Sequence, residues 1–294
     1  MQPEIWPPVP GQETTEHVTV DGQQLLVSVR HGQSDEIPLL LINGIGASMG
    51  VLQPFVDELD PSRTVIRFDA PGVGGSPMPP GPYRFGGLCR LIAGMLSRLG
   101  YASVDVLGIS WGGGVAQHFA AFHRDRCRRL VLVSTATGTV MVPARPSVLL
   151  RMATPRRYTD PGYMERVAPL LYGGSARDNP HRVRTEMQAH NRPESRRAYF
   201  YQLGAGLGWT SVPFLPRLRQ PTLIVSGNDD PIIPVANAYV MHRLIRHSRL
   251  HIFDGGHLGL VTEAALLAPV IERFLNVAAP GASQPGPLSQ WPAL

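Results

Sequence analysis

The sequence predicts an α/β protein with a mostly parallel, eight-stranded sheet and helices on both of its faces. Short apolar strand candidates alternate with amphipathic helical stretches over most of the 294 residues, as in sheets that are covered on both sides. The composition agrees, since 43% hydrophobic and 17% charged residues are values typical of globular domains. A chain of this length can bury a sizeable core.

The strand candidates begin with a hairpin. Residues 17–30, "HVTVDGQQLLVSVR", alternate around Asp21-Gly22, a strong signal for two antiparallel strands joined by a tight turn. Six further apolar runs complete the predicted sheet, at residues 38–43, 64–69, 103–109, 128–134, 221–227 and 249–254.

Three apolar stripes at helical spacing predict helices that pack on this sheet. Two lie at residues 88–99 and 266–275, and the third follows Ser110, with Val115, Phe119 and Phe122 as its buried face. Cys89 and Cys127 show no C-x-x-C spacing and are interpreted as reduced, structural thiols.

The strand–helix alternation stops after residue 138 and resumes at residue 221. The interval contains several prolines and short helical stretches, and it is too long for a structureless loop in a compact domain. We therefore expect an inserted helical cap at 139–220 and a core formed by 16–138 and 221–277. Residues 278–294 are rich in Pro, Gly and Ser, which predicts a flexible tail.

The distribution of charge along the chain indicates which kinds of partner the protein could bind. All 27 basic residues are arginine, and residues 139–220 hold 13 of them against five acidic residues. This basic segment is interpreted as a solvated surface, or as a segment that lies near an anionic surface or a carboxylate product, because guanidinium groups pair well with carboxylates. No nucleic-acid-binding motif accompanies the charge, so no nucleic-acid partner is expected.

Membrane insertion and export are not expected. No apolar run approaches the roughly 18 residues of a spanning helix. The first residues, "MQPEIWPPVPGQE", lack the basic and apolar regions of a secretory signal. We therefore expect a cytoplasmic protein without a transmembrane segment, whereas its oligomeric state cannot be read from the sequence.

A candidate nucleophile lies in "VLGISWGGG", residues 106–114. Ser110 stands between Gly108 and Gly112, after a strand candidate and before a helix candidate. In this G-x-S-x-G pattern the serine occupies a sharp turn at the sheet edge, and the glycines allow strand and helix to approach closely. The helix N-terminus then directs its amides towards a developing oxyanion.

The base and the acid are expected later in the chain, in the order serine, acid, histidine. His257 follows the last strand candidate on a short glycine loop and is the candidate base. The loop "VSGNDDPIIP" offers both Asp229 and Asp230, and only one of them can orient the imidazole. We favour Asp230, three residues after Gly227, and interpret Asp229 as a loop-capping carboxylate.

An oxyanion hole is predicted from two backbone amides. One belongs to Ile45 in the glycine loop "NGIGAS" after the third strand, and the other belongs to Trp111, next to the nucleophile. The expected chemistry is acyl transfer to Ser110, followed by attack of water. It requires no metal and no cofactor.

Taken together, these residues resemble the α/β-hydrolase fold, and the likeness covers roughly residues 16–277. Longer stretches resemble the intracellular medium-chain-length polyhydroxyalkanoate depolymerases of pseudomonads. The stretches that carry this resemblance are "LLLINGIGA", "FDAPGVGGSPMPPGPYRF", "GISWGGGVAQHFA", "TGTVMVPARPSVLLRMATPRRY", "APLLYGG" and "GAGLGWTSVPFLPRLRQPTLIVSGNDDPIIP".

The resemblance implies hydrolysis of a storage polyester on cytoplasmic granules, with Ser110, Asp230 and His257 as the catalytic residues. Most apolar residues of the cap are expected to form its own core, while Trp209 and Phe214 are candidates for contact with the acyl chain. Alternatives with the same triad are a general carboxylesterase, a carbon–carbon bond hydrolase and a perhydrolase. A non-catalytic granule protein is a further alternative.

Overall fold

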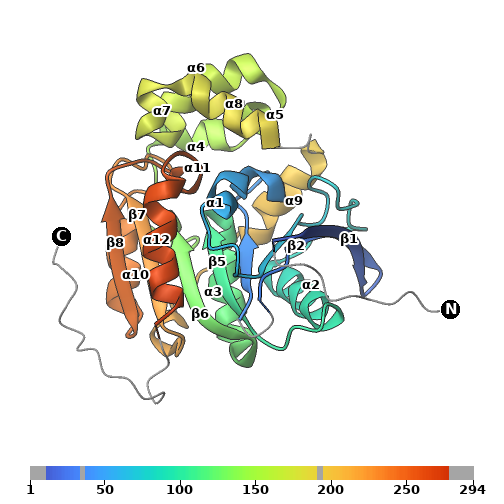
Figure 1. Ribbon diagram of the computed structural model, residues 1–294. Coiled ribbons are helices and arrows are strands. Elements are labelled where there is room, and N and C mark those ends of the chain that lie inside the picture. Colours follow the sequence, from blue (N-terminus) through green and yellow to red (C-terminus); the bar gives the residue numbers. More distant parts are fainter. Residues whose placement is uncertain (1–10, 34–36, 191–194, 278–294) are drawn as a thin grey trace.

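An eight-stranded sheet forms the centre of the computed structural model, which describes residues 11–33, 37–190 and 195–277 (Figure 1). The predicted α/β class is therefore confirmed, while the predicted flexible tail at 278–294 lies outside the described residues. The strands are β1 (Glu13–Val20), β2 (Gln23–Arg30), β3 (Leu39–Ile42), β4 (Val65–Phe68), β5 (Val104–Ile109), β6 (Cys127–Val133), β7 (Thr222–Gly227) and β8 (Ser248–Phe253).

The strand order is β1-β2-β4-β3-β5-β6-β7-β8. β1 and β2 form the expected antiparallel hairpin, and the turn residues Asp21 and Gly22 have φ values of 50° and 79°. Two successive positive φ angles explain why Asp-Gly is suited to this turn. β2 pairs antiparallel with β4, and all pairings from β4 to β8 are parallel.

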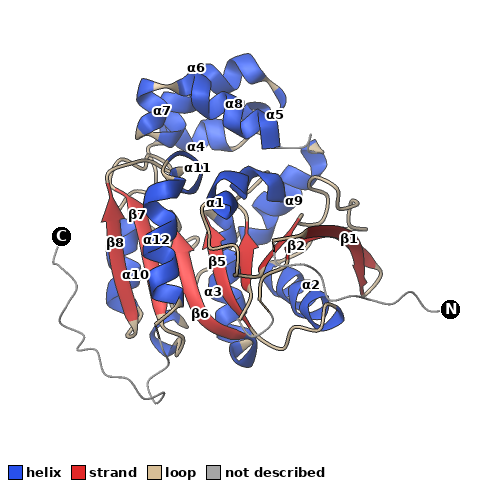
Figure 2. Cartoon of the chain, viewed as in Figure 1, coloured by secondary structure: helices blue, strands red, loops and turns tan. Residues whose placement is uncertain are grey.

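Helices cover both faces of the sheet (Figure 2). Buried residues of α2 (Phe85–Arg98), α3 (Trp111–Phe122) and α10 (Ala236–Leu244) join one hydrophobic cluster with the strands. Buried residues of α1 (Gln53–Asp57), α11 (Gly259–Thr262) and α12 (Ala264–Leu275) join a second cluster on the opposite face. Short 3₁₀ helices η1 (Met49–Leu52), η2 (Arg124–Arg126) and η3 (Leu215–Arg217) connect these elements.

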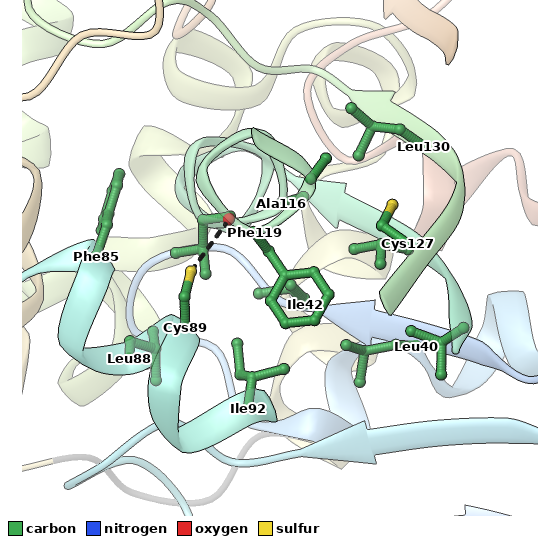
Figure 3. Close-up of a cluster of buried hydrophobic side chains, with 14 of the residues drawn as sticks. Leu40, Ile42, Phe85, Leu88, Cys89, Ile92, Ala116, Phe119, Cys127 and Leu130 are labelled. Atoms are coloured by element: carbon green, nitrogen blue, oxygen red, sulfur yellow. Dashed lines mark hydrogen bonds between the residues drawn. The ribbon is translucent and has the colours of Figure 1, made fainter. Parts of the chain in front are cut away.

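Figure 3 shows the first cluster, in which the Phe119 ring points from α3 towards Ile42 of β3 and Ile92 of α2. All three side chains are buried, so α3 is held firmly against the sheet directly after Ser110. Cys89 and Cys127 are free and buried, and burial raises the pKa of both thiols. These thiols therefore pack as small apolar groups, as expected.

Two residues of the predicted helix faces are exposed. Phe122 is 62% exposed and Leu266 is 57% exposed. Phe122 occupies the last position of α3, and its ring packs edge-on against Phe214 at a centroid distance of 5.6 Å. Leu266 lies in α12 next to the buried Leu267. The helices form where the spacing predicts them, but these two side chains point away from the core.

The segment predicted as a cap contains α4 (Pro146–Met152), α5 (Arg156–Thr159), α6 (Pro161–Tyr172), α7 (Ser175–Asp178), α8 (Pro180–His190) and α9 (Arg196–Gly206). In Figure 1, α4 to α8 gather at one end of the sheet and α9 lies apart from them. A third hydrophobic cluster joins Val167 and Leu171 of α6 to Ile232 and Leu258, in the loops after β7 and β8. These helices therefore sit over the carboxyl ends of the parallel strands.

The two ends of this segment meet before the predicted boundary at residue 220. Gly138 and Thr210 form an isolated antiparallel bridge. After the bridge, Leu215 and Leu218 are buried in the cluster of the sheet core. Leu215 and Leu218, near the end of the predicted cap, therefore pack with the sheet.

The cap buries an apolar core of its own, but several of the apolar residues expected to belong to it are exposed. Leu171 is buried, but Leu150 and Leu207 are more than 70% exposed. The short helices bury one narrow side each, so their other apolar side chains face solvent. The other exposed residues of that predicted core are Val140, Val142, Leu149 and Phe200. Among the helices of the described chain, none is long and apolar enough to cross a membrane.

Candidate active site

Ser110 occupies the turn between β5 and α3 in a rare backbone conformation. Its φ and ψ angles are 56° and −121°, outside the regions that residues with side chains normally adopt. Its amide donates to the Val133 carbonyl at 2.9 Å, and the Thr135 hydroxyl donates to its carbonyl at 2.7 Å. Such strain persists only when the surroundings enforce it, as they do here, and it is typical of functional positions.

The glycines beside Ser110 are required by close packing. A Cβ on Gly108 would lie 2.3 Å from the Gly112 carbonyl oxygen, and one on Gly112 would lie 2.2 Å from the Ile42 carbonyl oxygen. Both distances are far below van der Waals contact. The G-x-S-x-G pattern therefore allows β3, β5 and α3 to meet at this point, as the sequence predicts.

His257 and Asp230 lie together in the loops after β8 and β7. The Nδ1 atom of His257 is 2.7 Å from Oδ2 of Asp230, and both residues are at least 95% buried. The other carboxylate oxygen accepts from the amides of Ile232 and Ile233, each at 2.9 Å. The fixed carboxylate orients the imidazole and leaves Nε2 as the ring nitrogen without a partner among the described residues.

The cap contributes to the position of His257. Its backbone amide donates to the carbonyl oxygen of Tyr172, the last residue of α6, at 2.7 Å. The two rings stack at a centroid distance of 6.5 Å. The histidine loop is thus attached to the cap as well as to the sheet.

Asp229 has a different role from its neighbour Asp230. Its carboxylate accepts two hydrogen bonds from Arg177 of α7, at 2.7 and 2.8 Å, and one from the Gly174 amide at 2.7 Å. The bonds from Arg177, supported by the Gly174 amide, hold the pKa of Asp229 below its usual range. Asp229 therefore ties the cap to the loop after β7.

Ser110 and His257 line the same pocket, beneath the cap. The space between its lining atoms is about 470 Å³, part of it open to solvent. The cap contributes both polar and apolar side chains to this lining. The pocket is lined by residues of the loop after β3 (Asn43, Gly44, Ile45, Ala47), of the cap (Met152, Arg157, Tyr158, Tyr172, Met187) and of the sheet edge (Val51, Leu52, Ile109, Ser110, Ile232, His257, Leu258, Val261).

The predicted oxyanion donors, the amides of Ile45 and Trp111, make no hydrogen bond to any described residue. Two cap residues hold the loop that carries Ile45. The Tyr158 hydroxyl donates to the Ile45 carbonyl at 2.7 Å, and the Gln202 side-chain oxygen accepts from the Gly46 amide at 2.8 Å. The indole of Trp111 in turn donates to the Gln202 carbonyl at 2.8 Å. The loop is therefore preorganised from the cap side.

A second pocket lies on another side of Ser110 and is mainly apolar. Trp209, Phe85 and Met141 line it, and the Phe85 and Trp209 rings meet edge-on at 4.9 Å. Phe214, the other candidate for contact with substrate, lines neither this pocket nor the first. Its ring packs behind Trp209, at a centroid distance of 6.0 Å.

Sequence reasoning assigned no role to Arg157, Tyr158 or Gln202. The stretch "ATPRRY" belongs to the family resemblance, but its spacing gives no reason to place Arg157 or Tyr158 beside Ser110. Only the fold of the cap brings them there. In the described part of the chain, no three His, Cys, Asp or Glu side chains are grouped as a metal site would require.

A family model for the alpha/beta hydrolase fold matches residues 37–264. The chain belongs to the α/β-hydrolase family. The match extends from β3 to the first residue of α12, so it includes Ser110, Asp230 and His257.

This α/β hydrolase is 47% identical over 259 residues to a poly(3-hydroxyalkanoate) depolymerase of Ectopseudomonas oleovorans, covering 88% of this chain and 91% of that protein. The expected resemblance is thus confirmed. A 2-hydroxymuconate semialdehyde hydrolase of Pseudomonas putida is 29% identical, with 83% and 89% covered. The crystal structure of an enol-lactonase from Burkholderia xenovorans superposes with a TM-score of 0.76 at 23% identity, covering 88% and 99%.

Proposed function

We propose that this α/β hydrolase cleaves ester bonds of medium-chain-length polyhydroxyalkanoate, with Ser110 as nucleophile, His257 as base and Asp230 as orienting acid. The observation that carries the proposal is the 47% identity to a poly(3-hydroxyalkanoate) depolymerase, which extends over 88% of the chain and so includes the cap. Cap sequences select substrates in this fold, whereas the triad is common to many reactions.

The first half of the reaction forms an acyl-enzyme. His257 Nε2 takes the proton of Ser110 as Oγ attacks the ester carbonyl. The amides of Ile45 and Trp111 donate to the resulting oxyanion, and Asp230 stabilises the imidazolium through its bond to Nδ1. The carbonyl–oxygen bond then breaks, and His257 returns the proton to the leaving hydroxyl.

The second half regenerates the serine. Water takes the place of the departed alcohol, His257 removes one of its protons, and the hydroxide attacks the acyl carbon. Collapse of this second tetrahedral intermediate releases the 3-hydroxyacyl group as a carboxylate and returns the proton to Ser110.

Two surfaces suit a polyester. The pocket lined by Trp209, Phe85 and Met141 offers an apolar space beside Ser110 for an alkyl side chain. The exposed cap residues, of which Leu150 and Leu207 project most, offer contact with an apolar granule. We therefore assign the enzyme to the surface of polymer granules.

Hydrolysis assays on defined substrates test this function. Suspended poly(3-hydroxyoctanoate) and the dimer of 3-hydroxyoctanoate should be hydrolysed, and Ser110→Ala should abolish both activities. Cleavage of p-nitrophenyl esters without any release of 3-hydroxyalkanoates would instead indicate a general carboxylesterase. Cleavage of a ring-fission product with no ester hydrolysis would indicate a carbon–carbon bond hydrolase.

A further inference from the structure

Arg157 is a buried cation beside the nucleophile. It lies in α5, is 3% exposed, and lines the same pocket as Ser110 and His257. None of the described acidic residues forms an ion pair with it. A buried charge without a counter-ion is unfavourable, so its presence in a substrate pocket calls for an explanation.

Three other arginines of the cap, unlike Arg157, form ion pairs. They are more exposed than Arg157 and have carboxylate partners: Arg156 with Asp160 at 3.2 Å, Arg177 with Asp229 at 2.7 Å and Arg184 with Glu165 at 3.0 Å. Because these arginines lie in the same segment, its high arginine content alone does not explain why Arg157 is buried without a carboxylate partner.

Neutral groups hold the guanidinium in place. Nη1 donates to the Tyr199 hydroxyl at 2.9 Å and to the Thr154 carbonyl at 3.4 Å, while Nε has no hydrogen-bond partner in the structure. The guanidinium carbon lies 4.6 Å from the Tyr158 ring centroid and 5.3 Å from that of Tyr199. The tyrosines fix the orientation of the cation and leave donor capacity unused.

Arg157 stays charged in this environment. Burial disfavours the charged form, but a guanidinium does not lose its proton in proteins, and the Tyr199 hydroxyl and the rings of Tyr158 and Tyr199 stabilise the cation. An oriented, permanently charged guanidinium is matched in shape and charge by a carboxylate.

We infer that Arg157 binds the free carboxylate at the end of a polyester chain and so directs cleavage to the terminal ester bond. This inference rests on the proposed function. In a 3-hydroxyalkanoate chain the terminal carboxylate lies two carbons from the last ester oxygen, within the alcohol part of that ester. The first pocket therefore holds the terminal unit, and the apolar pocket at Trp209 takes the acyl side.

Cleavage of the terminal ester proceeds through the same acyl-enzyme. Ser110 Oγ bonds to the carbonyl carbon of the penultimate unit, and the bond from that carbon to the terminal unit's oxygen breaks. The proton passes from Ser110 through His257 to the departing oxygen. A free 3-hydroxyalkanoate leaves from Arg157, and water releases the rest of the chain with a new carboxylate at its end. The product of each cycle is thus a substrate for the next.

The test compares two dimers that differ in one group. They are the 3-hydroxyoctanoate dimer with a free carboxylate and the same dimer as its methyl ester. The wild-type enzyme should favour the free acid in kcat/KM by roughly 10- to 100-fold, as expected for a charge-assisted hydrogen bond. In Arg157→Gln the ratio should fall to about one. The matched control Arg156→Gln, which changes the exposed neighbour outside this pocket, should keep the wild-type ratio.

The outcomes distinguish a failure of the role assigned to Arg157 from a failure of the proposed function. A wild-type ratio near one, with both dimers cleaved, overturns the role of Arg157 and leaves the proposed function intact; so does an unchanged ratio in Arg157→Gln. Cleavage of p-nitrophenyl octanoate but of neither dimer overturns the proposed function as well. If Arg157→Gln does not fold, Arg157→Lys replaces it. Loss of planar, two-point pairing should then lower the ratio, and an unchanged ratio contradicts the inference.

Discussion

The sheet core and the cap contribute different residues to the site around Ser110. The core places Ser110, Asp230 and His257 on loops at the ends of parallel strands, where close packing permits little change. The cap places Arg157 and Trp209 around the same serine on short helices and loops. Changes in the core should therefore affect all substrates alike, whereas changes in the cap should affect the choice of substrate.

The largest effect is expected from Ser110→Ala. Loss of the nucleophile should lower kcat by a factor on the order of 10⁶ for every ester, as in other serine hydrolases. The measurement is kcat on p-nitrophenyl octanoate and on the 3-hydroxyoctanoate dimer. Ser147→Ala, an exposed serine on α4, is the control and should match the wild type. If the residual activity of Ser110→Ala differed between the two substrates, the expectation that changes in the core affect all substrates alike would be wrong.

Asp230→Asn should follow, with a loss of about 10⁴ in kcat, because an amide favours the wrong imidazole tautomer. Asp229→Asn should change kcat little, since Asp229 bonds to Arg177 and Gly174 rather than to His257. Comparison of kcat for the two variants on one ester decides the assignment. The opposite order would mean that the cap contact, and not the carboxylate on His257, sustains turnover.

Asp229→Asn should instead reduce stability in a pH-dependent way. The pKa of Asp229 is lowered by Arg177, so its stabilising effect is present above the unfolded pKa of about 3.9 and lost as the pH falls through the lower folded value. The difference in Tm between wild type and variant should therefore shrink between pH 7 and pH 3. A difference that is constant over this range would exclude the ion pair as its cause.

Trp209→Ala should alter selectivity more than rate. Removing the ring enlarges the apolar pocket and removes contact with the side chain of the substrate, so the preference for eight-carbon over four-carbon acyl esters should fall about 10-fold, the effect of one to two methylene groups. Ratios of kcat/KM for p-nitrophenyl octanoate and butyrate measure this. Phe214→Ala, which removes the ring behind Trp209 and outside the pocket, should leave the ratio close to its wild-type value.

The smallest effect is expected from Tyr158→Phe. Its hydroxyl holds the Ile45 carbonyl, and loss of one neutral hydrogen bond costs about 1 kcal/mol, or roughly fivefold in kcat, with little change in KM. Tyr163→Phe, on α6, is the matched control. An effect on KM alone would indicate that Tyr158 contacts substrate rather than positioning the oxyanion loop.

Local chemistry explains which features could be predicted from sequence. The turn at Asp21-Gly22 and the glycines around Ser110 follow from backbone geometry over a few residues. The pairing of Asp230 with His257 follows from strand order, because consecutive parallel strands bring their loops to one edge. Their catalytic roles remain predictions.

The cap residues could not be placed in this way. Arg157 lies in a helix of four residues, too short for any periodicity, and its burial depends on rings from α6 and α9. The exposure of Leu150 has the same origin, since hydrophobic character alone does not say which side of a short helix meets a neighbour.

The bond from the His257 amide to the Tyr172 carbonyl makes the histidine loop part of the lid's own anchorage. The carbonyl at the end of α6 therefore fixes the backbone of the catalytic histidine, so a substitution that displaces α6 is expected to lower kcat even for small esters that do not fill the pocket.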